Sequence, residues 1–64
     1  MIFEWDKDDG CFYVFKQFKT DDYYCIGCIS AQPFDYVFVP NTDFFTLAEM
    51  QEIADYMKYL VKSQ

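Results

Sequence analysis

The stretch that decides the fold is residues 46–62, TLAEMQEIADYMKYLVK. Thr46 and Glu49 form a capping box, because the Thr hydroxyl and the Glu carboxylate can each accept a hydrogen bond from the other residue's backbone N–H. Apolar residues recur every three or four positions, at Leu47, Met50, Ala54, Met57 and Val61, with Ile53 and Leu60 beside them. This spacing is typical of one apolar stripe on a helix. We therefore predict a helix over about 47–62 that packs on the rest of the chain.

The residues before this helix predict strands, because aromatic and β-branched side chains dominate the runs between polar breaks. The predicted strands cover about 2–6, 11–19 and 23–31, with a candidate fourth strand over 34–39. The fourth is left open because it lies between Pro33 and Pro40. Asp8-Asp9-Gly10 predicts a tight turn, and the short breaks favour antiparallel neighbours. The expected fold class is α+β: a three- to four-stranded antiparallel β-meander with one C-terminal α-helix packed on one face.

Side-chain alternation predicts the sheet face that the helix covers. In the first hairpin, Phe3 and Trp5 share a face with Phe12 and Val14, whichever turn joins the strands. A three-residue loop at 20–22 would add Phe18, Tyr24, Ile26 and Cys28 to this core face, which Lys16 interrupts. It would also set Phe15 opposite Gly27. A two-residue turn would instead exchange the faces of the third strand.

The second face of the sheet is expected to stay uncovered, because one helix with one stripe can cover only one face. With the three-residue loop, this face carries Tyr13, Phe15, Tyr23 and Ile29 together with Ile2, Glu4, Cys11, Gln17, Lys19 and Cys25. Tyrosine is favoured at protein interfaces because it offers a large ring with a polar tip. We therefore predict partner contacts at Tyr13, Phe15, Tyr23 and Ile29.

The charge balance restricts the class of partner. The 64 residues, enough for a single domain, carry 11 acidic residues against five Lys, with no Arg or His, for a net charge of −6. Direct binding to nucleic acid is therefore not expected, since phosphate backbones need clustered Lys and Arg. Asp8, Asp9, Asp21 and Asp22 fall in turns. They could meet a basic partner as mimics of DNA phosphates, or form only a solvated rim.

The residues do not assemble a catalytic group. Without His, the usual general base near neutral pH is missing, and two glycines cannot make a phosphate-binding loop. Cys25 and Cys28 lie in a strand pattern, where an offset of three places their thiols on opposite faces. Zinc would need four ligands, and Cys11 is the one remaining cysteine. We predict thiols that serve packing, with no enzyme activity, no cofactor and no metal.

The expected location is the cytoplasm of a host cell. Residues 1–6 lack the basic start and apolar core of a signal peptide. The least polar stretch, 23–31, is far shorter than the ~18 residues of a membrane span, so no membrane partner is expected. Three cysteines in a cytosol are expected to be reduced.

The chain resembles small acidic phage-encoded accessory proteins in size, charge and layout. The resemblance lies in the short acidic sequence, the Asp-Gly and Asp-Asp turns, and the closing segment Thr46-Leu47-Ala48-Glu49-Met50-Gln51-Glu52-Ile53-Ala54-Asp55. It contains no diagnostic motif, so no functional residue is carried over. Phage proteins of this type often block host machinery, as anti-CRISPR proteins, restriction or recombination inhibitors and RNA polymerase inhibitors do.

These observations predict a non-enzymatic protein-binding module. The resemblance implies an inhibitor that occludes a host nucleic-acid-handling complex, with a protein partner that presents a basic nucleic-acid-binding surface. The alternative is a structural or assembly protein that forms a homodimer or larger oligomer through its second sheet face, since association is a common remedy for the marginal stability of so short a chain.

Overall fold

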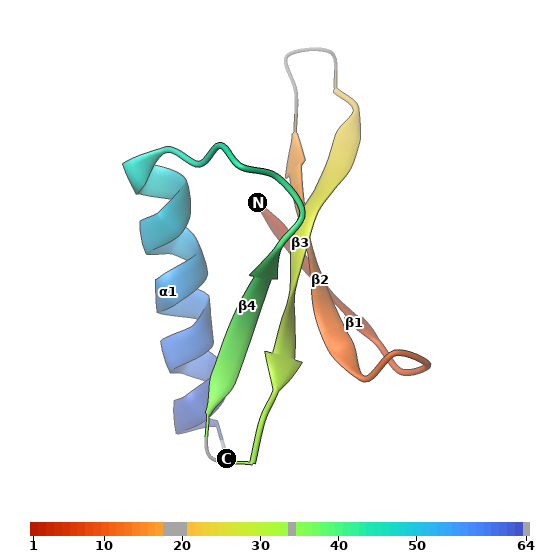
Figure 1. Cartoon of the computed structure of the whole chain (residues 1–64), viewed down its shortest axis with the longest axis vertical. Coiled ribbons are helices and arrows are strands. Elements are labelled where there is room, and N and C mark those ends of the chain that lie inside the picture. Colours follow the sequence, from red (N-terminus) through yellow and green to blue (C-terminus); the bar gives the residue numbers. More distant parts are fainter. Residues whose placement is uncertain (18–20, 34, 64) are drawn as a thin grey trace.

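The chain folds into an antiparallel sheet closed by a helix (Figure 1). The structure, a computed structural model, describes residues 1–17, 21–33 and 35–63. In this part of the chain the elements are β1 (Ile2–Asp6), β2 (Cys11–Gln17), β3 (Tyr23–Ala31), β4 (Tyr36–Pro40) and α1 (Leu47–Lys62). The strands lie in the order β1-β2-β3-β4, so the predicted α+β meander is confirmed. Residues 18, 19 and 34 of the predicted strands lie outside the described residues.

The fourth strand forms despite its flanking prolines, and it ends at Pro40 rather than before it. The Asn41 N–H donates to the Ile26 carbonyl at 2.7 Å, and the Gln32 N–H donates to the Asp35 carbonyl at 2.7 Å. In an antiparallel ladder such bonded positions alternate, so Pro40 directs its nitrogen away from β3. Its missing N–H therefore costs no ladder bond, which is how proline is tolerated on an edge strand.

The N-terminus of α1 has the predicted capping box. The Thr46 hydroxyl accepts from the Glu49 N–H at 3.1 Å, and the Glu49 carboxylate accepts from the Thr46 N–H at 2.8 Å. Glu49 also forms an ion pair with the ammonium group of Lys16 on β2. Lys16 therefore interrupts the core face of the sheet without being left as an unpaired charge there, and the pair joins the start of α1 to the end of β2.

The helix is turned about its axis relative to the prediction. Ile53 and Leu60 are buried. In contrast, Leu47, Met50 and Val61 of the predicted stripe each expose about half or more of their surface. The reason is aromatic packing: Tyr56 stacks on Phe3 with ring centroids 4.0 Å apart and meets Phe12 edge-on at 5.6 Å. Residues 53, 56 and 60 therefore face the sheet. The positions one residue further along the chain are rotated away by about 100°, although Met57 still packs against the core.

The core lies between α1 and one face of the sheet. Its buried members are Val14, Ile26, Ile29, Ile53 and Leu60, and Phe3, Phe12, Tyr24, Phe38 and Tyr56 pack around them. Trp5 is on this face, opposite Phe12, as the alternation in the first hairpin predicted. It lies beyond the reach of α1 and stays 57% exposed.

A β-bulge sets the register of the two central strands. Val14 lies opposite Gly27, but the next residue, Phe15, lies opposite Cys25, so Ile26 is an extra residue on β3. Beyond the bulge the alternation of β3 is reversed. The predictions for Cys28 and Ile29 were therefore wrong: Cys28 points away from the core and Ile29 points into it, with no exposed surface.

The prediction that Phe15 lies opposite Gly27 was wrong for the same reason. The ring that uses the bare backbone of Gly27 belongs to Phe38 on β4. A Cβ atom at Gly27 would lie 2.7 Å from Cζ of Phe38 and 2.6 Å from the Val39 carbonyl oxygen. Glycine is therefore required here by the close approach of β4.

Candidate protein-binding surface

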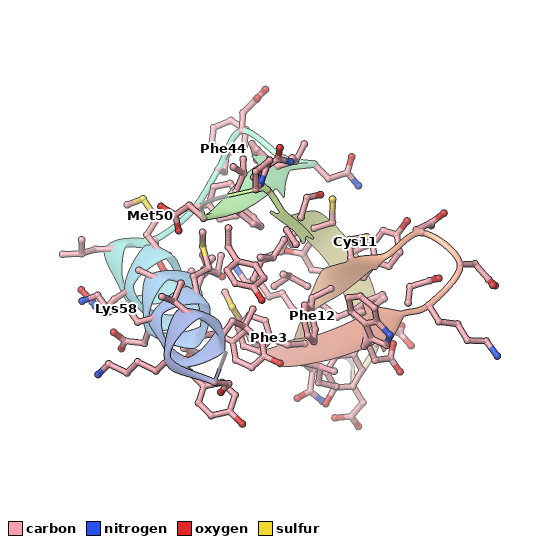
Figure 2. All side chains as sticks on the ribbon, turned by 90° about the horizontal axis from the view of Figure 1, so that it is seen from below. Phe3, Cys11, Phe12, Phe44, Met50 and Lys58 are labelled. Atoms are coloured by element: carbon pink, nitrogen blue, oxygen red, sulfur yellow. The ribbon has the colours of Figure 1, made fainter. Side chains whose placement is uncertain are left out.

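The face of the sheet opposite α1, here called the outer face, is not covered by the helix (Figures 1 and 2). Its aromatic and apolar members are Ile2, Cys11, Tyr13, Phe15, Tyr23, Cys25, Cys28, Val37 and Val39. Ile2, Tyr23, Val37 and Val39 are 39–49% exposed. Tyr13, Phe15, Cys25 and Cys28 are half-buried and Cys11 is buried, so the exposed apolar groups are distributed over β1, β3 and β4. Exposed apolar groups on a sheet face that no helix covers mark a candidate contact surface.

The structure separates the side chains that were predicted to contact a partner. Tyr13, Phe15 and Tyr23 lie on the outer face. Ile29 does not, because the bulge turns it into the core. Val37 and Val39 belong to the outer face but were not predicted. The alternation of β4 could have identified them, had the sequence shown that β4 pairs with β3.

The first turn is joined to the outer face through Tyr13. Its hydroxyl donates a hydrogen bond to Oδ2 of Asp9, and this bond is the main reason that the pKa of Tyr13 is raised. Oδ1 of Asp6 accepts from the N–H groups of Asp8 and Asp9 at 2.9 and 3.1 Å. Gly10 completes the turn with φ of +66°. These contacts place the Asp9 carboxylate at the end of the outer face.

The four aspartates predicted to contact a partner do not form one cluster. Asp8 and Asp9 lie in the β1–β2 turn, whereas Asp21 and Asp22 lie at the other end of β2, beside β3 (Figure 1). Asp21 has φ of +64° and accepts from the Gln17 side-chain amide at 3.2 Å. The acidic groups therefore mark the two ends of the sheet, with the apolar outer face between them.

The three cysteines share the outer face, contrary to the expectation that Cys25 and Cys28 would lie on opposite faces. The bulge at Ile26 absorbs one residue between them, so both point away from α1. All three thiols are free, and Cys11 is buried, which raises its pKa. Across residues 1–17, 21–33 and 35–63, no three side chains of the metal-binding types gather into a possible site.

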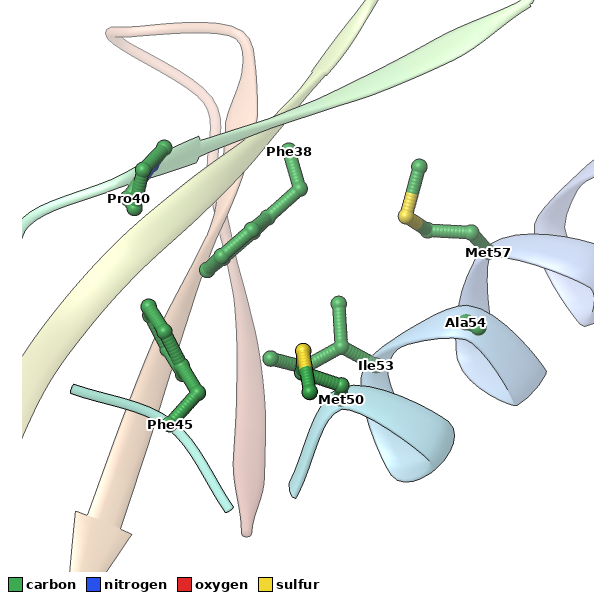
Figure 3. A pocket seen from close by; sticks show the side chains of 7 residues that line it. All are labelled: Phe38, Pro40, Phe45, Met50, Ile53, Ala54 and Met57. Atoms are coloured by element: carbon green, nitrogen blue, oxygen red, sulfur yellow. The ribbon is translucent and has the colours of Figure 1, made fainter. Parts of the chain in front are cut away.

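A hollow between α1 and β4 was not predicted (Figure 3). It has a volume of about 350 Å³ and is lined by Phe38, Pro40, Phe45, Met50, Ile53, Ala54 and Met57. Phe38 and Phe45 meet edge-on at 5.6 Å on its sheet side. All of these lining side chains are apolar. The sequence signal that could have revealed the hollow is the apolar stripe of α1, which is wider than one sheet face can bury.

Two pairs of aromatic rings lie on the side of α1 that faces away from this hollow. Trp5 contacts Phe12 at a centroid distance of 5.0 Å, and Tyr56 contacts Tyr59 at 5.8 Å. Tyr59 is 61% exposed. The sequence analysis placed Trp5 on the core face because side-chain alternation shows which face a residue lies on. Alternation does not show how far along the sheet the helix extends, so it could not predict that Trp5 is exposed.

Comparison with known proteins returned no matching family model, no matching curated protein and no matching solved structure. Among the described residues, the helix is too short and too polar to cross a membrane.

Proposed function

We propose that this chain is a non-enzymatic protein-binding module that contacts its partner with the outer face. The observation that carries the proposal is the uncovered sheet surface with Ile2, Tyr23, Val37 and Val39 exposed around Tyr13. A core of aromatic and aliphatic groups with a polar rim is the usual anatomy of a protein interface. Antiparallel ladders hold the four strands of this face together, with one bulge at Ile26.

The rim favours a basic partner. Asp9 lies at one end of the outer face and Asp21 at the other, within a chain of net charge −6. Carboxylates at both ends of an apolar surface complement Lys and Arg groups that flank a nucleic-acid groove. Together with the likeness to phage accessory proteins, this supports an inhibitor that occludes a host nucleic-acid-handling complex by steric contact, with the charges guiding the approach.

A tagged pull-down from host lysate, followed by mass spectrometry, tests this proposal. Val37→Glu and Tyr23→Ala alter exposed outer-face positions, so both should lose the retained protein. Phe44→Ala is the matched control, because Phe44 is 85% exposed but lies in the loop before α1, and it should retain the same protein. Equal retention by all three variants would contradict contact through the outer face.

Salt dependence distinguishes apolar contact from charge mimicry. If the outer face supplies most of the affinity, binding should weaken little between 50 and 500 mM salt. A loss of more than about a hundredfold would show that the aspartates carry the affinity, as expected of a DNA mimic.

The second candidate function is assembly of identical copies through the outer face. Val37 and Val39 support it, since both are apolar and exposed on this face. Light scattering tests it: a larger particle that Val37→Glu dissociates would favour assembly, whereas a monomer at high micromolar concentration would exclude it.

A further inference from the structure

Two of the three cysteines form a close pair on the outer face. Cys11 lies opposite Ser30 and Cys28 lies opposite Tyr13, so these four residues occupy neighbouring rungs of the β2–β3 ladder. No bulge separates the two rungs, because the register shift comes later, after Val14. Cys11 and Cys28 are therefore diagonal neighbours whose side chains lie on the same face.

The outer face itself covers the Cys11 thiol. Cys11 is 6% exposed, yet it does not belong to the core cluster beneath α1. Burial, and next the charge of the neighbouring Cys28 thiolate, raise the pKa of Cys11, and the Tyr13 hydroxyl interacts with the same sulfur atom. The Cys11 thiol therefore lies between Cys28 and Tyr13. Cys28 is half-buried, so an ion reaches the pair from solvent through Cys28.

The spacing of the pair suits a bridging atom better than a direct bond. Diagonal neighbours in an antiparallel sheet lie about 7–8 Å apart, whereas the Cα atoms of disulfide-bonded cysteines lie about 4.4–6.8 Å apart. Both thiols are free. An ion bonded to each sulfur atom at about 2.3 Å spans up to about 4.6 Å between them, which leaves β2 and β3 in register.

The third cysteine does not enlarge the set of ligands. Cys25 lies opposite Phe15, two rungs along the outer face from Cys11. Its thiol donates to the Gly27 carbonyl oxygen at 3.3 Å. In the part of the chain that the structure describes, no three side chains of the metal-binding types gather together. Zinc and iron–sulfur clusters, which need four ligands, are therefore unsuited to this pair.

We infer that Cys11 and Cys28 bind one Cu(I) ion between β2 and β3. Thiolates are soft ligands that select soft ions, and Cu(I), with its filled d shell, is satisfied by two thiolates in line. Binding forms two copper–sulfur bonds and releases the two thiol protons to solvent. The burial of Cys11 keeps water from competing for the ion. No protein partner is needed, so failure of this binding and failure of the proposed function are distinguishable.

Anaerobic titration of the full chain with Cu(I), in competition with bicinchoninate, tests the inference. The absorbance of the Cu(I)–bicinchoninate complex should show one copper withdrawn per chain. Cys11→Ser and Cys28→Ser should each weaken binding at least about a hundredfold, the upper end of what the loss of a supporting group around a metal site costs. Cys25→Ser is the matched control and should bind Cu(I) as tightly as the unmodified chain.

Alkylation of the unmodified chain gives a second readout, because Cys11 is buried and a Cys11 variant that unfolds would lose the site for a different reason. Iodoacetamide should label Cys28 more slowly once one equivalent of Cu(I) is bound, while the labelling rate of Cys25 should stay the same. Mass spectrometry of the digested chain measures both rates.

Two results would overturn the inference. The first is a chain that withdraws no copper from bicinchoninate. The second is a Cys25→Ser variant that loses binding as Cys28→Ser does, together with slower labelling of Cys25, because Cys25 and Cys28 would then be the pair that holds the ion.

Discussion

Gly27→Ala is expected to destabilise the fold through the contact between β3 and β4. The added Cβ would lie 2.6 Å from the Val39 carbonyl oxygen and 2.7 Å from Cζ of Phe38. The ring can swing away, but it borders the α1–β4 hollow and would leave its contact with Phe45. The Val39 oxygen is a backbone atom of the β3–β4 ladder, so β4 itself must shift to make room.

The expected loss is about 1–3 kcal/mol, the usual cost of overpacking a well-packed interior. In a chain of this size, each kcal/mol lowers Tm by roughly 4–8 °C. Urea unfolding followed by tryptophan fluorescence and by far-UV circular dichroism measures the free energy of unfolding and shows whether the transition stays two-state.

Gly10→Ala is the matched control. Gly10 has φ of +66° but no atom within 4 Å of the position a Cβ would take, so the substitution there reports backbone strain without steric contact. Its cost should be about 1 kcal/mol. If Gly27→Ala were no more destabilising than Gly10→Ala, the close approach of Phe38 and Val39 would not be what requires glycine.

Three further predictions concern the cap and the first turn. Thr46→Ala should lower the free energy of unfolding by about 1 kcal/mol, measured by urea titration, because it removes the hydroxyl that caps α1. The Lys16 ammonium, and next the Thr46 N–H, lower the pKa of Glu49, so the folded state gains stability above the unfolded pKa and loses it as the pH falls through the folded pKa. Glu49→Gln should therefore flatten the loss of stability in acid below about pH 4.5, and an unchanged acid limb would contradict this. The hydrogen bond to the Asp9 carboxylate raises the pKa of Tyr13, so Asp9→Asn should lower that pKa in an ultraviolet titration, and an unchanged titration curve would contradict this.

Short-range signals predicted most of the fold correctly. The capping box defined the start of α1 because both of its hydrogen bonds join residues three positions apart. The first hairpin defined which residues face each other on β1 and β2, because either turn length leaves Phe3 and Phe12 on the same face. β4 was left open because a proline reads as a strand breaker, and only the ladder shows that Pro40 points away from β3.

The sequence by itself determined that an aromatic-rich sheet would have one face covered by a helix and one face left open, because a single apolar stripe cannot cover two faces. Only the tertiary structure decided which residues occupy the open face and which side of α1 faces the core. The bulge at Ile26 depends on how β3 fits between β2 and β4, and it moved Ile29 into the core and Cys28 out of it. The rotation of α1 depends on Tyr56 stacking against Phe3, 53 residues earlier in the chain. Both are long-range packing choices, and local patterns do not encode them.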